Sequence, residues 1–229
     1  MTDGVGPRIR VMKDGPYLVD GALPLAKQTI VVDELGESVA WQEGETLPAR
    51  HSCALCRCGE SSAKPYCDGS HRSVGFDGTE TAAHSTYAEA SMRIEGPELV
   101  LLDELDLCAD ARFCAAKGRI WRRVPDGDEE SRAIVIEQAR LCPAGRYTAV
   151  DRATGHVHEP DLEASIGVVE DPSQGVSGPL WVRGGVPIVS ADGDPYEVRN
   201  RVTLCRCGGS KNKPFCDSAH VEIGFNDED

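Results

Sequence analysis

Two stretches of this chain place three cysteines and one histidine at the same spacing. Each begins Cys-x-Cys, continues for eight residues and ends Cys-Asp-x-x-His, and the second copy starts 149 positions after the first. The candidate ligands are Cys56, Cys58, Cys67 and His71 in the first copy, and Cys205, Cys207, Cys216 and His220 in the second. Thiolates combined with one imidazole suit zinc or an iron–sulfur cluster. The sequence therefore predicts two metal centres.

The likeness of the two copies extends beyond these ligands. Residues 55–76 align with residues 204–225 without a gap, and 13 of the 22 positions are identical. Upstream, the segment 15–25 (GPYLVDGALPL) is similar to the segment 178–188 (GPLWVRGGVPI). Each copy is therefore a small module, with a strand-turn-strand entry followed by a metal loop. Two copies are too few for a solenoid, and they indicate a pseudo-twofold pair.

The string Cys-Asp-Gly-Ser-His at 67–71 resembles the CDGSH iron–sulfur domain of the mitoNEET family, and the resemblance covers residues 10–80 and 162–229. It implies a [2Fe–2S] cluster in each loop. The first two cysteines would bind one iron, and the third cysteine and the histidine would bind the other. Family members pair two such modules into a dimer, so we expect an intrachain pseudo-dimer here.

The ligand chemistry narrows the use of these centres. Replacing a thiolate by imidazole raises the reduction potential of a cluster, and protonation of the imidazole removes a ligand. Three uses follow: electron transfer, redox or pH sensing, and delivery of a cluster to an apo-acceptor. Structural zinc sites commonly use Cys-x2–4-Cys, which the Cys-x-Cys spacing matches poorly. A structural zinc-binding protein remains an alternative interpretation.

The segment between the copies carries Cys108, Cys114 and Cys142, and the last is followed by Pro143. Bacterial-type ferredoxins use Cys-x2-Cys-x2-Cys and a distant Cys-Pro, but Ala111 stands at the second cysteine position here. The segment resembles a divergent single-cluster ferredoxin domain. Three thiolates fit a [3Fe–4S] cluster, whereas a [4Fe–4S] cluster needs a fourth ligand. The candidates for a fourth ligand are Asp110, Cys53 and His84. Three unrelated structural cysteines are the alternative.

Glycine and proline together number 38 and aromatic residues are only 5%, which favours short strands and turns around small cores. Strand-like runs occur at 17–19, 29–32, 98–102, 133–136, 167–169 and 180–182. The stretch 103–117 is the most helix-like, and the run 134–139 reads as a strand leading into Cys142. We predict a mainly β fold with short helices, built of small α+β modules. The predicted domains are residues 1–80, 81–161 and 162–229.

The formal net charge of −14 excludes nucleic acid as a natural partner, because like charges repel. It suits a basic redox protein or an apo-acceptor protein. No apolar run reaches the ~20 residues that span a bilayer, so no membrane association is expected. The first ten residues show no secretory signal, and we predict a cytoplasmic protein with reduced thiols.

The sequence therefore predicts an electron-transfer protein with two [2Fe–2S] clusters and a [3Fe–4S] or [4Fe–4S] cluster. Cluster storage and delivery, or redox and pH sensing, is the alternative. No nucleophile–base set and no glycine-rich dinucleotide loop is present, so we expect no enzyme activity of its own. A redox subunit of a separate enzyme also fits. We expect a monomer with an internal pseudo-twofold axis or a homodimer.

Overall fold

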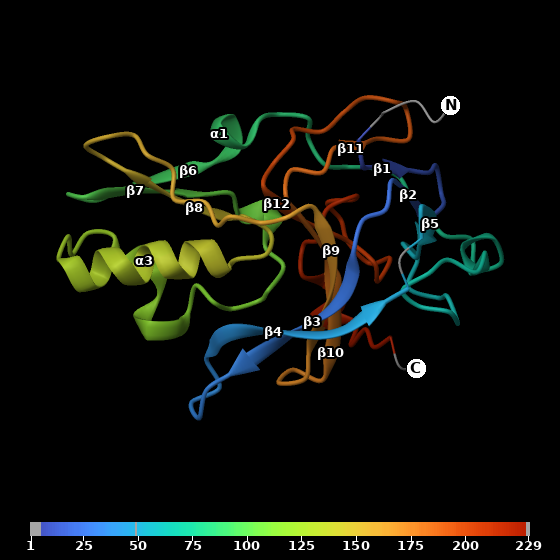
Figure 1. Cartoon of the computed structure of the whole chain (residues 1–229), viewed down its shortest axis with the longest axis horizontal. Coiled ribbons are helices and arrows are strands. Elements are labelled where there is room, and N and C mark those ends of the chain that lie inside the picture. Colours follow the sequence, from blue (N-terminus) through green and yellow to red (C-terminus); the bar gives the residue numbers. More distant parts are fainter. Residues whose placement is uncertain (1–5, 49, 228–229) are drawn as a thin grey trace.

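A computed structural model describes residues 6–48 and 50–227 of the chain. The described residues form a mainly β structure with three sheets and short helices, as predicted. The two repeated modules lie together on the right of Figure 1, and the middle domain lies on the left. No helix among the described residues has the length and apolar character that a bilayer crossing requires.

Two of the sheets are shared between the repeated modules. The first sheet has the order β11 (Ile188–Val189), β1 (Arg8–Val11), β2 (Tyr17–Asp20) and β5 (Ser52–Leu55). The second sheet has the order β12 (Arg201–Leu204), β10 (Val176–Arg183), β9 (Ser165–Asp171), β3 (Leu25–Val32) and β4 (Ser38–Leu47). Each sheet therefore contains strands from both ends of the chain.

The sharing is a reciprocal strand exchange. Strand β11 of the second module pairs in parallel with β1, with Ile9 opposite Ile188. Strand β3 of the first module pairs in parallel with β9, with Leu25 opposite Ile166. Since Leu25 and Ile188 are equivalent in the aligned copies, the two pairings are related by a pseudo-twofold axis. The predicted intrachain pseudo-dimer is confirmed.

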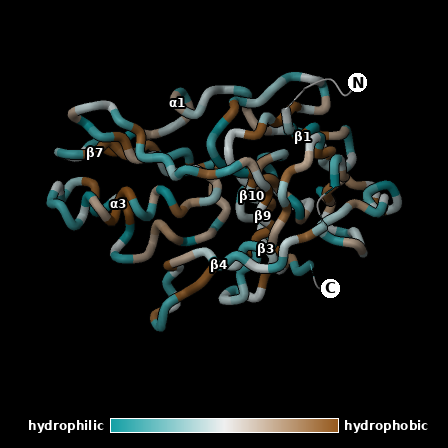
Figure 2. The backbone as a smooth tube through the Cα atoms, viewed as in Figure 1, coloured by the Kyte–Doolittle hydropathy of each residue, from teal (hydrophilic) through white to brown (hydrophobic). Residues whose placement is uncertain are grey.

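One hydrophobic core lies between the two modules. Its buried residues include Ile9, Val19 and Leu55 from the first module, and Ile166, Val182 and Leu204 from the second. Figure 2 shows hydrophobic residues gathered where β3, β9 and β10 meet, and again along α3 and β7. Because both modules supply one core, each module depends on the other for burial of its apolar strands.

The middle domain is a three-stranded antiparallel sheet packed against one helix. The sheet order is β6 (Met92–Glu95), β7 (Leu99–Asp103) and β8 (Tyr147–Asp151). Helix α3 (Glu129–Leu141) lies against this sheet (Figure 1), and a separate core holds the two together. The short elements of the described chain are η1 (Ser70–Arg72), α1 (Tyr87–Ala90), η2 (Leu105–Leu107), η3 (Ala116–Gly118), α2 (Ile120–Arg123) and α4 (Ala219–Glu222).

Helix α3 corrects one prediction. The β-branched runs at 133–136 and 134–139 were expected to be strands, and both lie within this helix of 13 residues. The Asp128 side chain accepts a hydrogen bond from the amide of Ser131 and caps the helix. Its buried residues fall at the helical spacing and are Ser131, Ile134, Val135, Gln138 and Ala139. Packing of one apolar face outweighs the weak preference of Ile and Val for strands.

Most of the other predicted strands are confirmed, and one predicted helix is wrong. The runs 17–19, 29–32, 167–169 and 180–182 lie in β2, β3, β9 and β10, and residues 99–102 lie in β7. The stretch 103–117 was expected to be helical, and this was wrong, since it holds only the short helix η2 and the first residues of η3. Between these two short helices, Asp110 has a φ of 50° and Arg112 a φ of 62°, and a right-handed helix does not accommodate positive φ angles.

Candidate metal centres

In each repeated module the four candidate ligands form two close pairs. Two cysteines come first, with Sγ atoms 3.7 Å apart for Cys56 and Cys58 and 3.7 Å for Cys205 and Cys207. The third cysteine pairs with the histidine. Its Sγ lies 3.4 Å from Nδ1 in Cys67 and His71, and 3.5 Å from Nδ1 in Cys216 and His220. The structure thus brings all eight predicted residues together in the expected pairs.

These separations fit two ligands on one tetrahedral metal. Two thiolates at about 2.3 Å from such a metal stand about 3.8 Å apart, and a thiolate and an imidazole nitrogen stand about 3.6 Å apart. Among the residues that the structure describes, no three Cys, His, Asp or Glu side chains converge on a single metal position. Each module thus arranges its four candidate ligands as two pairs, each with the spacing of two ligands on one metal.

The backbone holds the two pairs in place. Cys56 follows strand β5, and its amide donates to the Pro65 carbonyl at 2.8 Å, while the amide of Cys67 donates to the Ala54 carbonyl at 2.9 Å. The second module repeats this pattern. There the amide of Cys205 donates to Pro214 at 2.9 Å and that of Cys216 to Thr203 at 2.9 Å. The third cysteine is thus tied to the strand that carries the first.

The aspartate after the third cysteine fixes the turn that carries the histidine. Asp68 accepts from the amides of Ser62 at 2.9 Å and Ser70 at 3.0 Å, and these bonds, with those of the two serine hydroxyls, lower its pKa. Asp217 likewise accepts from Lys211 at 2.7 Å and Ala219 at 3.1 Å. Each aspartate stands one residue before the N-cap. Its carboxylate binds one amide of the preceding loop and the first amide of the short helix, so it holds the two together.

The N-cap position itself differs between the copies. Gly69 has a φ of 97°, and Ser218 at the equivalent position has a φ of 72°. The exchange of glycine for serine therefore falls at a position that has a positive φ in both copies. A residue with a side chain is disfavoured in this left-handed region, whereas glycine is not.

The two cluster loops meet at the pseudo-twofold axis. Cys58 and Cys207 form an isolated antiparallel bridge between the modules. A Cβ atom on Gly59 would lie 2.6 Å from the Cys207 carbonyl oxygen, and one on Gly208 would lie 2.5 Å from that of Cys58. Only glycine permits this approach. The second cysteine of each set therefore lies at the backbone contact between the two centres.

The arginine between the first two cysteines is buried in both copies but has different partners. Arg57 donates to the carbonyl oxygens of Met12 and Gly78, and its Nε has no partner. Arg206 donates to two carbonyl oxygens and also to the carboxylates of Glu170 at 2.8 Å and Asp227 at 2.5 Å. The first module therefore holds a buried cation beside its site, and the second holds that cation with two carboxylates.

The two histidines differ in exposure. His71 and Cys67 are only partly buried, whereas His220 is 4% exposed and Cys216 is 2% exposed. Burial lowers the pKa of His220 to about 4, because the charged imidazolium loses its hydration. The first site thus opens to solvent through its third cysteine and histidine, and the second is enclosed.

The three cysteines of the middle domain line one cavity, together with Asp110, Ala111 and Tyr147. Cys108 and Cys114 come from the loop after η2, and Cys142 follows the end of α3. Burial raises the pKa of the Cys114 thiol to about 12, as expected of a thiol that is not exposed to water.

Of the three predicted fourth ligands, only Asp110 lines this cavity. Cys53 lies on β5 opposite Val19 and packs against the core of the repeated modules. The ring of His84 stacks on Tyr196 with a centroid distance of 4.3 Å. These two candidates were therefore wrong, because tertiary packing carries their segments to other parts of the molecule.

The middle cavity lies directly against the second module. Ala109, Ala144 and Cys216 form one buried cluster, and Leu107 and Cys142 pack against it. A residue of the second metal centre thus contacts the ligand loops of the middle domain. Aromatic contacts continue this interface, since the Trp41 ring contacts both Phe113 and Trp181 in a third cluster.

Two arginines, one of them buried, connect the middle domain to the second module. Arg112 of the middle loop forms a bidentate pair with Asp171, at 2.5 Å and 3.1 Å. Arg201 of β12, 1% exposed, donates to the carbonyl oxygen of Cys142 at 2.7 Å and to that of Ala139 at 2.8 Å. It also pairs with Glu159. Carbonyl groups at the C-terminal end of α3 carry partial negative charge, so the positively charged guanidinium stabilises this end of the helix.

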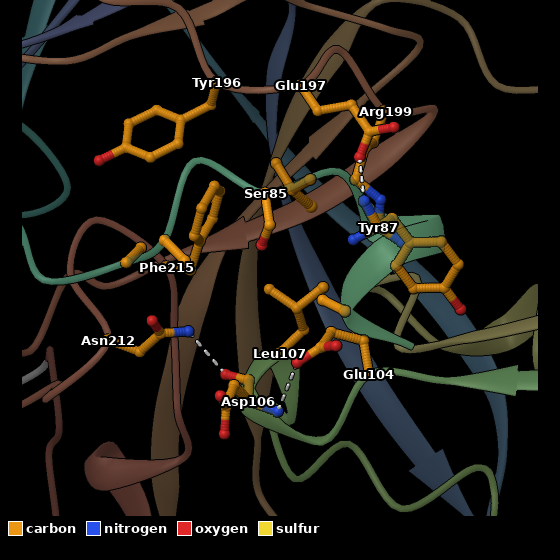
Figure 3. A pocket seen from close by; sticks show the side chains of 14 residues that line it. Ser85, Tyr87, Glu104, Asp106, Leu107, Tyr196, Glu197, Arg199, Asn212 and Phe215 are labelled. Carbon is orange, nitrogen blue, oxygen red and sulfur yellow. Dashed lines mark hydrogen bonds between the residues drawn. The ribbon is translucent and has the colours of Figure 1, made fainter. Parts of the chain in front are cut away.

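A cavity of about 110 Å³ lies beside this interface (Figure 3). Leu107 and Phe215 line it, and each immediately precedes a candidate ligand, Cys108 or Cys216. Asn212 donates to the Asp106 carbonyl at 2.8 Å across one side. Ligand sites for cofactors usually exceed about 300 Å³, so this cavity is too small for a nucleotide cofactor.

The fold and the paired ligands define a protein built of small iron–sulfur domains. Residues 14–72 and 177–221 match the family described as iron-binding zinc finger of CDGSH type, and residues 94–152 match the family described as divergent 4Fe-4S mono-cluster. The chain thus contains two CDGSH-type regions that flank a divergent 4Fe–4S mono-cluster domain, and it binds iron–sulfur clusters. Comparison with curated proteins and with solved structures found no match.

Sequence reasoning missed the residues that surround the ligands. Arg57 and Arg206 stand inside the Cys-x-Cys motifs, so their position was visible but their burial was not. Arg201 could have been noticed, because the aligned position in the first copy is Ser52. Tyr147 follows the Cys-Pro motif by four residues and gave no signal of its own.

Proposed function

We propose that this protein transfers electrons through three iron–sulfur clusters arranged in a row. The C-terminal CDGSH site contacts both of the others. It meets the middle site through the buried cluster of Ala109, Ala144 and Cys216, and it meets the N-terminal site through the Cys58–Cys207 bridge. This contiguity is the observation that carries the proposal, since cluster storage does not need sites in contact.

The protein's residues suit this role in two ways. Thiolate and imidazole ligands in matched pairs can hold a cluster in both oxidation states with little movement, because the loops are fixed by backbone hydrogen bonds. The partly exposed His71 and Cys67 provide the place where a partner protein could approach the row of clusters. A net charge of −14 favours a basic partner by long-range attraction.

The middle cluster is proposed as [3Fe–4S] on its three cysteines, or as [4Fe–4S] with Asp110 as the fourth ligand. Asp110 lines the cavity, although its carboxylate also accepts from Gln174 at 3.2 Å. The two CDGSH sites are proposed to hold [2Fe–2S] clusters on the eight paired residues.

The test begins with iron and sulfide analysis of anaerobically purified protein, which should give about seven or eight irons per chain. The dithionite-reduced protein is then mixed with oxidised cytochrome c, a basic one-electron acceptor. We expect rapid reoxidation with iron and sulfide retained, and EPR signals broadened by interaction between neighbouring clusters. Reoxidation that is slower than cluster loss, or three signals without interaction, would refute the proposal.

Cluster delivery is the second candidate, and the exposure of the N-terminal site favours it. The Cys67 and His71 pair is the only half of the two CDGSH ligand sets that is partly exposed, so an acceptor could reach it. Mixing the loaded protein with an apo-ferredoxin measures this directly. Delivery predicts transfer of one [2Fe–2S] cluster per chain, with the other clusters retained.

A further inference from the structure

The cavity of the middle domain holds a polar group that no ligand assignment uses. Tyr147 opens strand β8 and lines this cavity beside Cys108, Cys114 and Cys142. Its side chain is 0% exposed, and its hydroxyl oxygen has no hydrogen-bond partner among the residues that the structure describes. Buried polar groups are nearly always partnered, so an unpartnered hydroxyl at a ligand cavity indicates a partner supplied by the ligand.

The position of the Tyr147 ring is fixed from three sides. The β7–β8 register places Tyr147 opposite Asp103. The guanidinium of Arg146 lies 4.7 Å from the ring centroid and is itself held by Asp103, with Nε to Oδ1 at 2.6 Å. The Trp121 ring stacks with the Tyr147 ring at a centroid distance of 6.5 Å. A side chain held in this way presents its hydroxyl at one point.

The chemistry of the site makes this hydroxyl a donor. A phenol has an ordinary pKa of about 10, and burial disfavours the charged phenolate, so the buried Tyr147 keeps its proton at neutral pH. A protonated phenol offers one O–H, and thiolate or sulfide sulfur is an acceptor. We propose that Tyr147 donates a hydrogen bond to a sulfur atom of the middle cluster or of its cysteine ligands. Tyr147 would thereby adjust the reduction potential of this cluster without being one of its ligands.

Such a bond has a definite effect. Reduction adds negative charge to a cluster, and a hydrogen bond to its sulfur stabilises the reduced form more than the oxidised form. Tyr147 therefore raises the reduction potential of the middle cluster. The inference rests on the proposal that these three cysteines hold a cluster, but it does not rest on electron transfer to a partner.

Tyr147→Phe is the first test, since it removes the hydroxyl and keeps the ring. In an EPR-monitored redox titration, we expect unchanged iron content, a lower potential for the middle cluster and unchanged potentials for both CDGSH clusters. Tyr87→Phe is the matched control. Its hydroxyl, in the same domain, donates to the Arg146 carbonyl at 2.8 Å and does not line the cavity. The control should leave all three potentials unchanged.

A second variant keeps the inference testable if Tyr147→Phe does not fold. Replacing Tyr147 by 3-fluorotyrosine keeps the hydroxyl and makes it a stronger donor, so the potential of the middle cluster should rise above that of the wild type. A merely structural role would not give opposite shifts for the two variants. Equal potentials in all three proteins would overturn the inference.

The remaining outcomes are also decisive. Loss of one iron from the middle cluster in Tyr147→Phe would make Tyr147 a ligand and overturn its assignment as a donor. Wild-type protein with only about four irons would refute the three-cysteine cluster itself, before any variant is made. A full iron content with an unshifted potential would overturn the Tyr147 inference alone.

Discussion

The two CDGSH regions have the same ligand pairs and the same strand pairing, yet their surroundings differ. The C-terminal site is covered by the middle domain, and its arginine has two carboxylate partners. The N-terminal site is partly open, and its arginine has none among the contacts of the described chain. The comparison teaches that one ligand set can serve as an internal site or as a surface site, depending on what packs over it.

The largest expected effect comes from removing the arginine that joins the C-terminal site to the middle domain. Arg201→Ala removes a buried guanidinium that donates to the Cys142 and Ala139 carbonyl groups at the end of α3, which should lower the free energy of unfolding by about 3 kcal/mol. Thermal unfolding followed by circular dichroism should show a melting temperature lower by about 6–12 °C.

Ser52→Ala is the control for this variant, because Ser52 occupies the aligned, exposed position of the first copy. Its effect should stay within about 0.5 kcal/mol. If the two variants melted alike, the middle domain would not be fastened through Arg201, and the contrast between an enclosed and an open site would lose its physical basis.

The second largest expected effect is a difference between the two sites in the pH at which each loses its cluster. The pKa of His220 in the folded protein, about 4, lies below its ordinary value of 6.5. Between these values the unfolded chain binds the extra proton, so stability falls as the pH drops from 6.5 towards 4. Because the C-terminal site is enclosed, its cluster should be lost together with unfolding, whereas the partly exposed N-terminal site should lose its cluster from a folded protein at a less acidic pH.

Cluster absorbance and far-ultraviolet circular dichroism, recorded on the same samples from pH 8 to pH 4, measure this order. The N-terminal signal should fade while the dichroism is unchanged. His71→Cys replaces the partly exposed imidazole ligand by a thiolate, and it should make the first transition disappear. Simultaneous loss of both clusters in the wild type would contradict the assigned difference in exposure.

The arginine partners should set different reduction potentials. Glu170 accepts a hydrogen bond from Arg206 and adds negative charge near the C-terminal site. This charge destabilises the reduced cluster, because reduction makes the cluster more negative. Glu170→Gln should raise the potential of that cluster by on the order of 1 kcal/mol, or about 40 mV for one electron. An EPR-monitored titration checks the shift, and Asp20→Asn should leave it unchanged, because that carboxylate pairs with Arg8 and Arg10 and not with Arg206.

The smallest expected effect exchanges the residues at the turn before each histidine. Ser218→Gly removes the strain of a side-chain-bearing residue at a positive φ, which is about 1–3 kcal/mol. The greater flexibility of glycine in the unfolded chain reduces this gain by about 0.5–1 kcal/mol. The net gain should be about 1 kcal/mol, or about 2–4 °C in melting temperature. Gly69→Ser should cost a similar amount. Shifts of the same sign in both variants would show that φ does not govern this position.

The ligand sets and the pseudo-dimer could be predicted because both depend on local spacing and on a repeat. A Cys-x-Cys pair and a Cys-x3-His pair each bring their ligands within reach of one metal. The repeat of residues 15–25 and 178–188 indicated equivalent strands. Which strands exchange could not be read from either copy alone, because the register of Ile9 with Ile188 joins residues far apart in the sequence.

The rest of the site depends on packing between distant segments. Nothing near His220 in the sequence indicates that the middle domain buries it, whereas His71 has the same motif and is partly exposed. The strand predicted before Cys142 was wrong for a related reason. The β-branched run suggested a strand, but its helical spacing became decisive only with β7 and β8 to pack against.

The reciprocal exchange of β3 and β11 has a consequence for divergence. In a homodimer of one sequence every substitution is made twice, so both sites change together. Here the two halves are joined in one chain and each position occurs once. The chain carries Ser52 in one half and Arg201 in the other, and Gly69 in one and Ser218 in the other. Covalent joining therefore allows a symmetrical scaffold to hold two unlike sites, one specialised for the interior and one for the surface.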